Sequence, residues 1–111
     1  MKVSELTGAT LNWAVAKCEG LLCFGYRTDG ERFDVEDSEG NIEGFTPSTN
    51  WAQGGPIIER EKVTIEWTGE DWMGYIRHDE EFFGPTPLIA AMRCYVASKL
   101  GDEVDVPEEL I

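Results

Sequence analysis

Apolar residues recur at helical spacing in two segments, one near each end of the chain. In the first segment, four apolar residues lie at i, i+3, i+4 and i+7 and so share one helix face: Leu11, Ala14, Val15 and Cys18. Thr7 precedes this stripe as an N-cap, and Leu6 stands where a hydrophobic staple to Leu11 is expected. Gly20 follows as a C-terminal stop. The pattern predicts a helix over 8–19.

The second helical segment lies near the other end of the chain. Its apolar stripe consists of Ile89, Met92, Val96 and Leu100. Thr86 stands as an N-cap with Pro87 at the first helical position, and Gly101 follows the last apolar residue. We therefore predict a helix over 87–100.

Between these helices the period changes to two, which is typical of strands. Residues 62–68 and 72–77 form a predicted hairpin around the turn at 69–71, and residues 21–28 and 32–36 form another around Asp29-Gly30. The order helix, two strands, polar segment, two strands, helix predicts an α+β fold of two layers. We expect one antiparallel sheet of about four strands, with the N-terminal and C-terminal helices on one face. A chain of 111 residues fits a single domain over 1–111.

The remaining segments lack a clear period. Residues 37–44 are acidic and contain glycine, which predicts an exposed loop, and residues 80–85 are interpreted as a connector. Residues 57–61 are expected to form one helical turn with Pro56 at its first position. The acidic tail 102–111 has apolar residues that either dock on the core or leave the tail frayed.

The charge of the chain limits its partners. Lysine and arginine number 9 against 22 acidic residues, a formal net charge of −13. Such a chain should repel nucleic acid backbones and anionic membranes, so we expect no direct contact with either. Two interpretations of the charge stay open: a solvated acidic surface, or a DNA mimic or inhibitor that binds a basic partner.

Several chemistries are disfavoured by residue content. Residues 1–20 lack the apolar region of a signal peptide, and no apolar run is long enough to span a membrane. The three cysteines show no CxxC spacing, which favours a reducing compartment, with Cys18 and Cys94 as small buried hydrophobes. The single histidine, His78, excludes a multi-histidine metal site within one chain and is interpreted as an exposed turn residue. We expect no metal, no cofactor and no catalytic residue, since no carboxylate pair is singled out either.

The decapeptide Pro47–Pro56 is the strongest candidate for recognition. It combines two hydroxyls, two amides, an indole and two adjacent glycines, which together provide hydrogen bonds, a stacking surface and open backbone N–H groups. The candidate ligand-binding residues are Ser48, Thr49, Asn50, Trp51, Gln53, Gly54 and Gly55. The alternative is a structured loop whose polar groups satisfy its own backbone.

A second candidate lies at the start of the predicted helix 87–100. Thr86 and the free N–H groups of a helix N-terminus suit a phosphate or carboxylate, and Arg93 follows two turns later. The alternative is plain N-capping by Thr86. Other cations available to an anion are Arg60, Lys62 and Arg77, although Arg60 beside Glu59 and Glu61 is more typical of a surface ion pair.

Three stretches of the chain resemble the NinX-like family of tailed bacteriophages and prophages, a domain of unknown function. These stretches are 6–9 with 13–20, 47–58, and 83–97, whereas 21–44 looks least similar. The resemblance implies a phage accessory protein made in the host cytoplasm, and it supplies no catalytic residue.

Three functions follow as hypotheses. The first is a non-catalytic binder of a nucleotide-like small molecule, a sponge that counters host defence signalling, expected to be a homo-oligomer. The second is an acidic inhibitor or DNA mimic that binds a basic host protein, for example a defence protein. The third is a small hydrolase of nucleotide signals, which the lack of a catalytic constellation makes the weakest.

Overall fold

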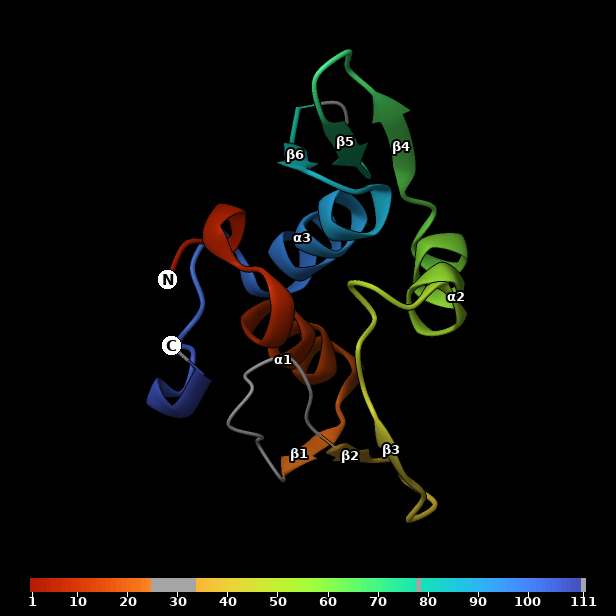
Figure 1. The fold of residues 1–111 in the computed structure, drawn as a ribbon, viewed down its shortest axis with the longest axis vertical. Coiled ribbons are helices and arrows are strands. Elements are labelled where there is room, and N and C mark those ends of the chain that lie inside the picture. Colours follow the sequence, from red (N-terminus) through yellow and green to blue (C-terminus); the bar gives the residue numbers. More distant parts are fainter. Residues whose placement is uncertain (25–33, 78, 111) are drawn as a thin grey trace.

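The computed structural model describes residues 1–24, 34–77 and 79–110. Two helices lie in the middle of the molecule: α1 (Gly8–Glu19) and α3 (Pro87–Leu100) (Figure 1). Both have the bounds that the sequence predicts. The α1 N-terminus is closed by Thr10, whose Oγ1 accepts a hydrogen bond from Thr7 N at 3.0 Å. Gly20 ends α1 with φ of 72°, a left-handed conformation that glycine adopts without strain.

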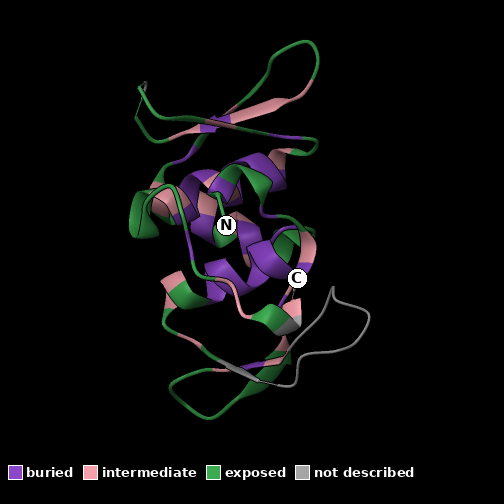
Figure 2. Ribbon diagram, turned by 90° about the vertical axis from the view of Figure 1, so that its left-hand side faces the viewer, coloured by how far each residue is buried: buried purple, intermediate pink, exposed green. Residues whose placement is uncertain are grey.

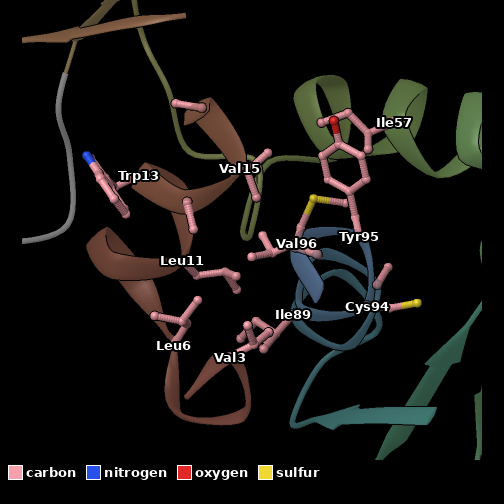
Figure 3. Packing of buried hydrophobic residues seen from close by; sticks show 14 of the residues in the cluster. Val3, Leu6, Leu11, Trp13, Val15, Ile57, Ile89, Cys94, Tyr95 and Val96 are labelled. Carbon is pink, nitrogen blue, oxygen red and sulfur yellow. The ribbon is translucent and has the colours of Figure 1, made fainter. Parts of the chain in front are cut away.

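The core forms where α1 and α3 contact each other (Figure 2). Figure 3 shows Leu11 and Val15 of α1 on the side toward Val96 of α3, and all three are fully buried. Tyr95 is buried as well and lies beside Ile57, which belongs to the third helix, α2 (Trp51–Glu61). The apolar stripes predicted from spacing are therefore the faces that these helices bury against each other.

A three-stranded sheet from the second half of the chain, here called the second sheet, packs on α3. It consists of β4 (Thr64–Trp67), β5 (Trp72–Tyr75) and β6 (Glu81–Gly84), antiparallel in the order β4-β5-β6. The hairpin β4–β5 confirms the predicted one. Strand β6 lies in the segment interpreted as a connector, and that interpretation was wrong. Adjacent Phe82 and Phe83 in a strand this short hide the period of two that identifies a strand.

The other sheet, here called the first sheet, lies on the opposite side of the helix pair (Figure 1). It consists of β1 (Leu22–Phe24), β2 (Asp34–Glu36) and β3 (Ile42–Gly44), antiparallel in the order β1-β2-β3. The predicted turn Asp29-Gly30 lies outside the described residues. Strand β3 corrects the predicted loop 37–44: Asp37 Oδ1 accepts from Glu39 N at 2.9 Å and from Asn41 N at 3.0 Å, which turns the chain back onto β2.

The α+β class, the antiparallel pairing and the helix near each end are confirmed. The strands form two sheets of three rather than one sheet of about four. The reason is the position of α2 between β3 and β4, because a helix of this length carries the chain from the α1 side of the helix pair to the α3 side.

The termini are held together beside α1 and α3. Met1 N donates to Val104 O at 2.9 Å, and Val104 N donates to Met1 O at 2.9 Å. Short 3-10 turns flank this pairing at Val3–Glu5 and Glu108–Leu110. Val104 is buried and Leu110 packs against the core, so the tail docks instead of fraying.

Candidate functional site

The decapeptide is half turn and half helix. Residues 47–49 form a turn, Asn50 is the N-cap, and α2 begins at Trp51. The prediction of an irregular segment followed by a helical turn with Pro56 at its first position was wrong, since Pro56 lies inside α2. Gly55 explains how the helix tolerates this proline, because a residue without Cβ removes part of the clash that proline imposes on its predecessor.

The two glycines of the decapeptide have different roles. A Cβ at Gly54 would lie 2.5 Å from Pro47 O and 2.7 Å from Leu88 Cδ2. Gly54 therefore lets α2 approach both its own preceding turn and the first turn of α3. A Cβ at Gly55 would lie 4.0 Å from the ring of Trp51, which is ordinary contact. Close packing accounts for the first glycine and not for the second.

Most of the polar groups predicted to read a ligand contact the protein itself. Asn50 Oδ1 accepts from Ala52 N at 3.0 Å, which caps α2. Gln53 Nε2 donates to Gly44 O at 2.8 Å, and Gln53 Oε1 accepts from Thr46 N at 2.7 Å. These bonds fix the connection between β3 and α2. They favour the alternative of a loop that satisfies its own backbone.

Ser48 is the buried member of this set. Its backbone N donates to Asn12 Oδ1 at 3.0 Å, which ties the turn to α1. Its hydroxyl is buried and has no hydrogen-bond partner among the described residues. Thr49 and Trp51 are exposed, and the Trp51 side chain keeps 54% of its surface in contact with solvent. Of the predicted residues in the decapeptide, these two present side chains to a ligand most openly.

The second predicted site, at the start of α3, is also occupied by internal contacts. Thr86 Oγ1 accepts from Ile89 N at 3.1 Å, an ordinary N-cap. Arg93 Nε donates to Leu6 O at 2.9 Å and Arg93 Nη1 donates to Phe83 O at 2.7 Å. Burial lowers the pKa of Arg93 from its ordinary value. Arg93 thus links the N-terminal segment to β6. Gly54 against Leu88 brings the two predicted sites next to each other, but their polar groups are largely used within the fold.

A cluster that the sequence did not reveal joins the three helices. Arg60 donates from Nη1 to Glu19 Oε1 at 3.1 Å and from Nη2 to the hydroxyl oxygen of Tyr95 at 3.2 Å. Tyr95 donates its hydroxyl to Glu19 Oε2. Arg60 also pairs with Glu61, at 2.9 Å from Nε to Oε2, so the predicted local ion pair is present. The contacts join positions far apart in sequence, and no local spacing signals them.

The pKa shifts in this cluster favour structure over catalysis. Burial raises the pKa of Glu19, but hydrogen bonds from Arg60 and Tyr95 outweigh it and leave this pKa below its ordinary value. Burial, followed by the hydrogen bond to Glu19, raises the pKa of Tyr95. Both groups move away from neutrality, whereas a general acid or base works best with a pKa near the working pH. The cluster therefore holds helices together in fixed charge states.

The second sheet presents one face to α3 and one to solvent. A Cβ at Gly74 would lie 2.9 Å from Ala90 O, so the Gly74 face is the one that packs on α3. Cross-strand register and alternation place six residues on the opposite face, here called the outer face of the second sheet: Thr64, Glu66, Met73, Tyr75, Glu81 and Phe83. Phe83 is 46% exposed, and Tyr75 donates its hydroxyl to Glu66 Oε1 at 3.1 Å.

A polar pocket of about 340 Å³ opens where the ends of α2, β5 and α3 converge. Its charged lining residues are Glu61, Arg77, Glu80 and Lys99. Lys99 Nζ lies 3.3 Å from Glu61 Oε1, so one cation is already paired. Two cations and two carboxylates balance each other, which gives the pocket no net preference for an anionic or a cationic ligand.

Among residues 1–24, 34–77 and 79–110, no group of three or more histidine, cysteine, aspartate or glutamate side chains is placed to hold a metal ion. Within the same residues, none of the helices combines the length and apolar character needed to cross a membrane. Cys94 is buried, Cys18 is partly buried, and burial raises the pKa of each thiol to about 11. His78 lies outside the described residues.

Comparison with known proteins identifies the family of the chain. No curated protein matches it. A family model described as "Bacteriophage P22, NinX" matches residues 2–99. The match includes α1, α2, both sheets and nearly all of α3. The chain therefore belongs to the bacteriophage P22 NinX family.

Proposed function

We propose that this phage-family protein acts without catalysis, by binding a basic protein of the bacterial host. The observation that carries the proposal is an excess of exposed carboxylates over cations, several of which already have contacts within the protein. Arg60, Arg93 and Lys99 contact carboxylates or carbonyls of the protein itself, and Lys17 lies 5.9 Å from the centre of the Trp13 ring. Most described carboxylates are exposed to solvent, and they outnumber the described cations.

This distribution gives the surface a negative field that internal ion pairs do not cancel. The formal net charge is −13, and four of the seven described cations already have contacts within the protein: Lys17, Arg60, Arg93 and Lys99. A field of this sign increases the association rate of a basic protein and repels acidic ones, and salt screens it. Inhibition of a host defence protein is one role that such binding would serve.

The test is capture of a partner from host lysate by the tagged full chain, over a series of rising salt concentrations. We expect a basic protein to be captured at low salt and lost steeply as salt rises. Capture that is unaffected by salt, or the absence of any basic partner, contradicts the proposal.

The nucleotide sponge remains the second candidate, and Trp51 is the observation that favours it. Trp51 is 54% exposed and its ring lies beside Gly55, so a base could stack on it, a contact worth about 1–3 kcal/mol. Calorimetry with cyclic dinucleotides and ADP-ribose derivatives tests it, with Trp51→Ala compared with Trp67→Ala, which removes an exposed indole elsewhere. Equal binding by both variants argues against the sponge. Recovery of a chemically altered ligand would instead favour the hydrolase.

A further inference from the structure

The outer face of the second sheet is an apolar strip between carboxylates. Glu66, Met73 and Phe83 form one row across the three strands, and Thr64, Tyr75 and Glu81 form the next. Met73, Tyr75 and Phe83 are therefore neighbours, with an acidic residue on each edge strand. We propose that this face is the docking site for a partner segment that carries lysine or arginine side chains alongside apolar ones. The inference rests on the proposed function and gives it a location.

The apolar strip has the composition of an interface centre. Aromatic residues and methionine are enriched in protein interfaces, and aromatic anchors contribute much of the binding free energy. Phe83 keeps 46% of its surface exposed although it lies within a strand, and Met73 and Tyr75 are partly exposed beside it. Burying this strip under a partner removes apolar surface from water.

The charges around the strip select a basic partner. Glu66 and Glu81 lie on the face, and the turns that bound the sheet add the exposed carboxylates of Glu70, Asp79 and Glu80 against one exposed cation among their described residues, Arg77. The Tyr75 hydroxyl holds Glu66 in place at 3.1 Å. A second copy of the chain would bring the same carboxylates against one another, and such like-charge contacts are unfavourable. Charge complementarity therefore favours a basic segment over self-association.

The sheet is also held rigidly from behind. A Cβ at Gly74 would lie 2.9 Å from Ala90 O and one at Gly84 would lie 2.8 Å from Ala90 N, so sheet and helix backbones are in close contact. Arg93 Nη1 binds Phe83 O at 2.7 Å and anchors β6 directly behind the exposed ring. A face fixed in this way loses little conformational entropy when a partner binds.

The first sheet supplies a matched control. Its register places Leu22, Glu36 and Ile42 in one row, with Leu22 66% and Ile42 60% exposed. Ile42 and Phe83 are thus exposed apolar residues on edge strands of the two sheets. Only Phe83 has the aromatic and methionine neighbours and the carboxylates on both edges of its face.

The experiment measures binding of a labelled peptide of alternating arginine and valine to the full chain, by fluorescence anisotropy. Amide chemical shifts in NMR spectra locate the peptide. We expect the peptide to change the amide chemical shifts of β4–β6. We expect Phe83→Ser to weaken peptide binding about tenfold, equivalent to about 1.4 kcal/mol. Ile42→Ser should bind as the natural chain does. The double variant Glu66→Lys and Glu81→Lys keeps the apolar strip and should also lose the peptide. A peptide of alternating glutamate and valine should not bind.

Lysate capture with the same variants separates this inference from the proposed function. A salt-sensitive basic partner that is lost with Phe83→Ser or the double lysine variant, and kept with Ile42→Ser, supports both. A salt-sensitive partner kept by both outer-face variants overturns the docking face and leaves the binding function standing. Failure to capture any such partner with the natural chain contradicts the proposed function. If the peptide changes amide chemical shifts outside β4–β6 instead, the outer face is not the docking site. If Phe83→Ser fails to fold, the double lysine variant decides the result.

Discussion

The two sheets have the same size and topology but are attached to the helices in different ways. Both are three-stranded antiparallel meanders. The β4–β6 sheet approaches α3 through Gly74 and Gly84, so that backbone lies directly on backbone. The β1–β3 sheet reaches the core with the side chain of Val35, which is 2% exposed. The glycine contact is possible because Gly74 and Gly84 have no side chain, whereas the Val35 contact is made by the side chain itself.

This difference has a consequence for substitution. Adding atoms at the glycine contact should push the second sheet off its helix, and removing atoms at Val35 should loosen the first. Figure 2 shows that buried residues concentrate in the central helices, while both sheets have extensive exposed surface. Each sheet therefore depends on a few contacts, and single substitutions should separate their contributions.

The largest effect is expected for Gly74→Val. A Cβ at this position would lie 2.9 Å from Ala90 O, a backbone atom that cannot move without shifting α3. We expect the free energy of unfolding to fall by about 3 kcal/mol, at the upper end of the range for overpacked cores. Chemical denaturation measures this loss. A change no larger than that of the surface substitution Glu43→Ala would mean that the sheet does not rest on α3 at this glycine.

A similar effect is expected for Gly54→Ala, which tests whether glycine contact also positions α2. The new Cβ would lie 2.5 Å from Pro47 O, and we expect a loss of about 2–3 kcal/mol. Gly55→Ala is the control, because its Cβ meets only the Trp51 ring at 4.0 Å. Alanine favours a helix over glycine by about 1 kcal/mol, but its Cβ restores part of the clash with Pro56, so this control should lose less stability than Gly54→Ala. Equal losses in thermal unfolding would refute the different roles assigned to the two glycines.

A smaller and more local effect is expected for Val35→Ala. The substitution removes two buried methyl groups, and we expect the free energy of unfolding to fall by about 2 kcal/mol. Hydrogen exchange should quicken at amides of β1–β3 more than at those of β4–β6. If the amides of both sheets quicken to the same extent, Val35 is not the particular attachment of the first sheet.

The smallest effect is expected for Glu19→Gln, which weakens the cluster between α1 and α3. Loss of the charged hydrogen bonds should cost about 1 kcal/mol near neutral pH, since Arg60 is half exposed and solvent screens the pair. The pKa of Glu19 is lowered in the folded protein, so its contribution is complete above the unfolded pKa and is lost as pH falls through the folded one. Denaturation of both chains from neutral to acidic pH should show the gap between them closing. A gap that stays constant with pH would rule out this ionic role.

The parts of the fold that could be predicted are those governed by local signals. Thr7 and Gly20 marked the limits of α1, and Thr86 and Gly101 marked those of α3, because capping depends on neighbours in sequence. The missed elements were β3, β6 and the first half of α2. The strands are too short to show a period, and Pro56 concealed a helix that Gly55 makes possible.

In the candidate sites, too, only the features set by neighbours in sequence could be predicted. Thr86 as an N-cap was foreseen as the plain alternative, and the structure bears it out. The engagement of Arg93 with Leu6 O and Phe83 O was not foreseeable, because both carbonyls lie on other elements. Ligand binding by the exposed Trp51 stays a prediction. The outer face of the second sheet could not be identified without β6, since Phe83 was assigned to no strand.

The sequence by itself determined the two central helices, the β4–β5 hairpin, the α+β class and the negative charge, since each depends on composition or on residues within a few positions of one another. Tertiary structure alone decided that the strands form two sheets, that Gly54 and Gly74 are contact points, and that Arg60 joins Glu19 to Tyr95. It also decided which face of the second sheet packs on α3 and which face is turned away from it. Such outcomes depend on which distant backbones and side chains meet in space, and no local pattern records that.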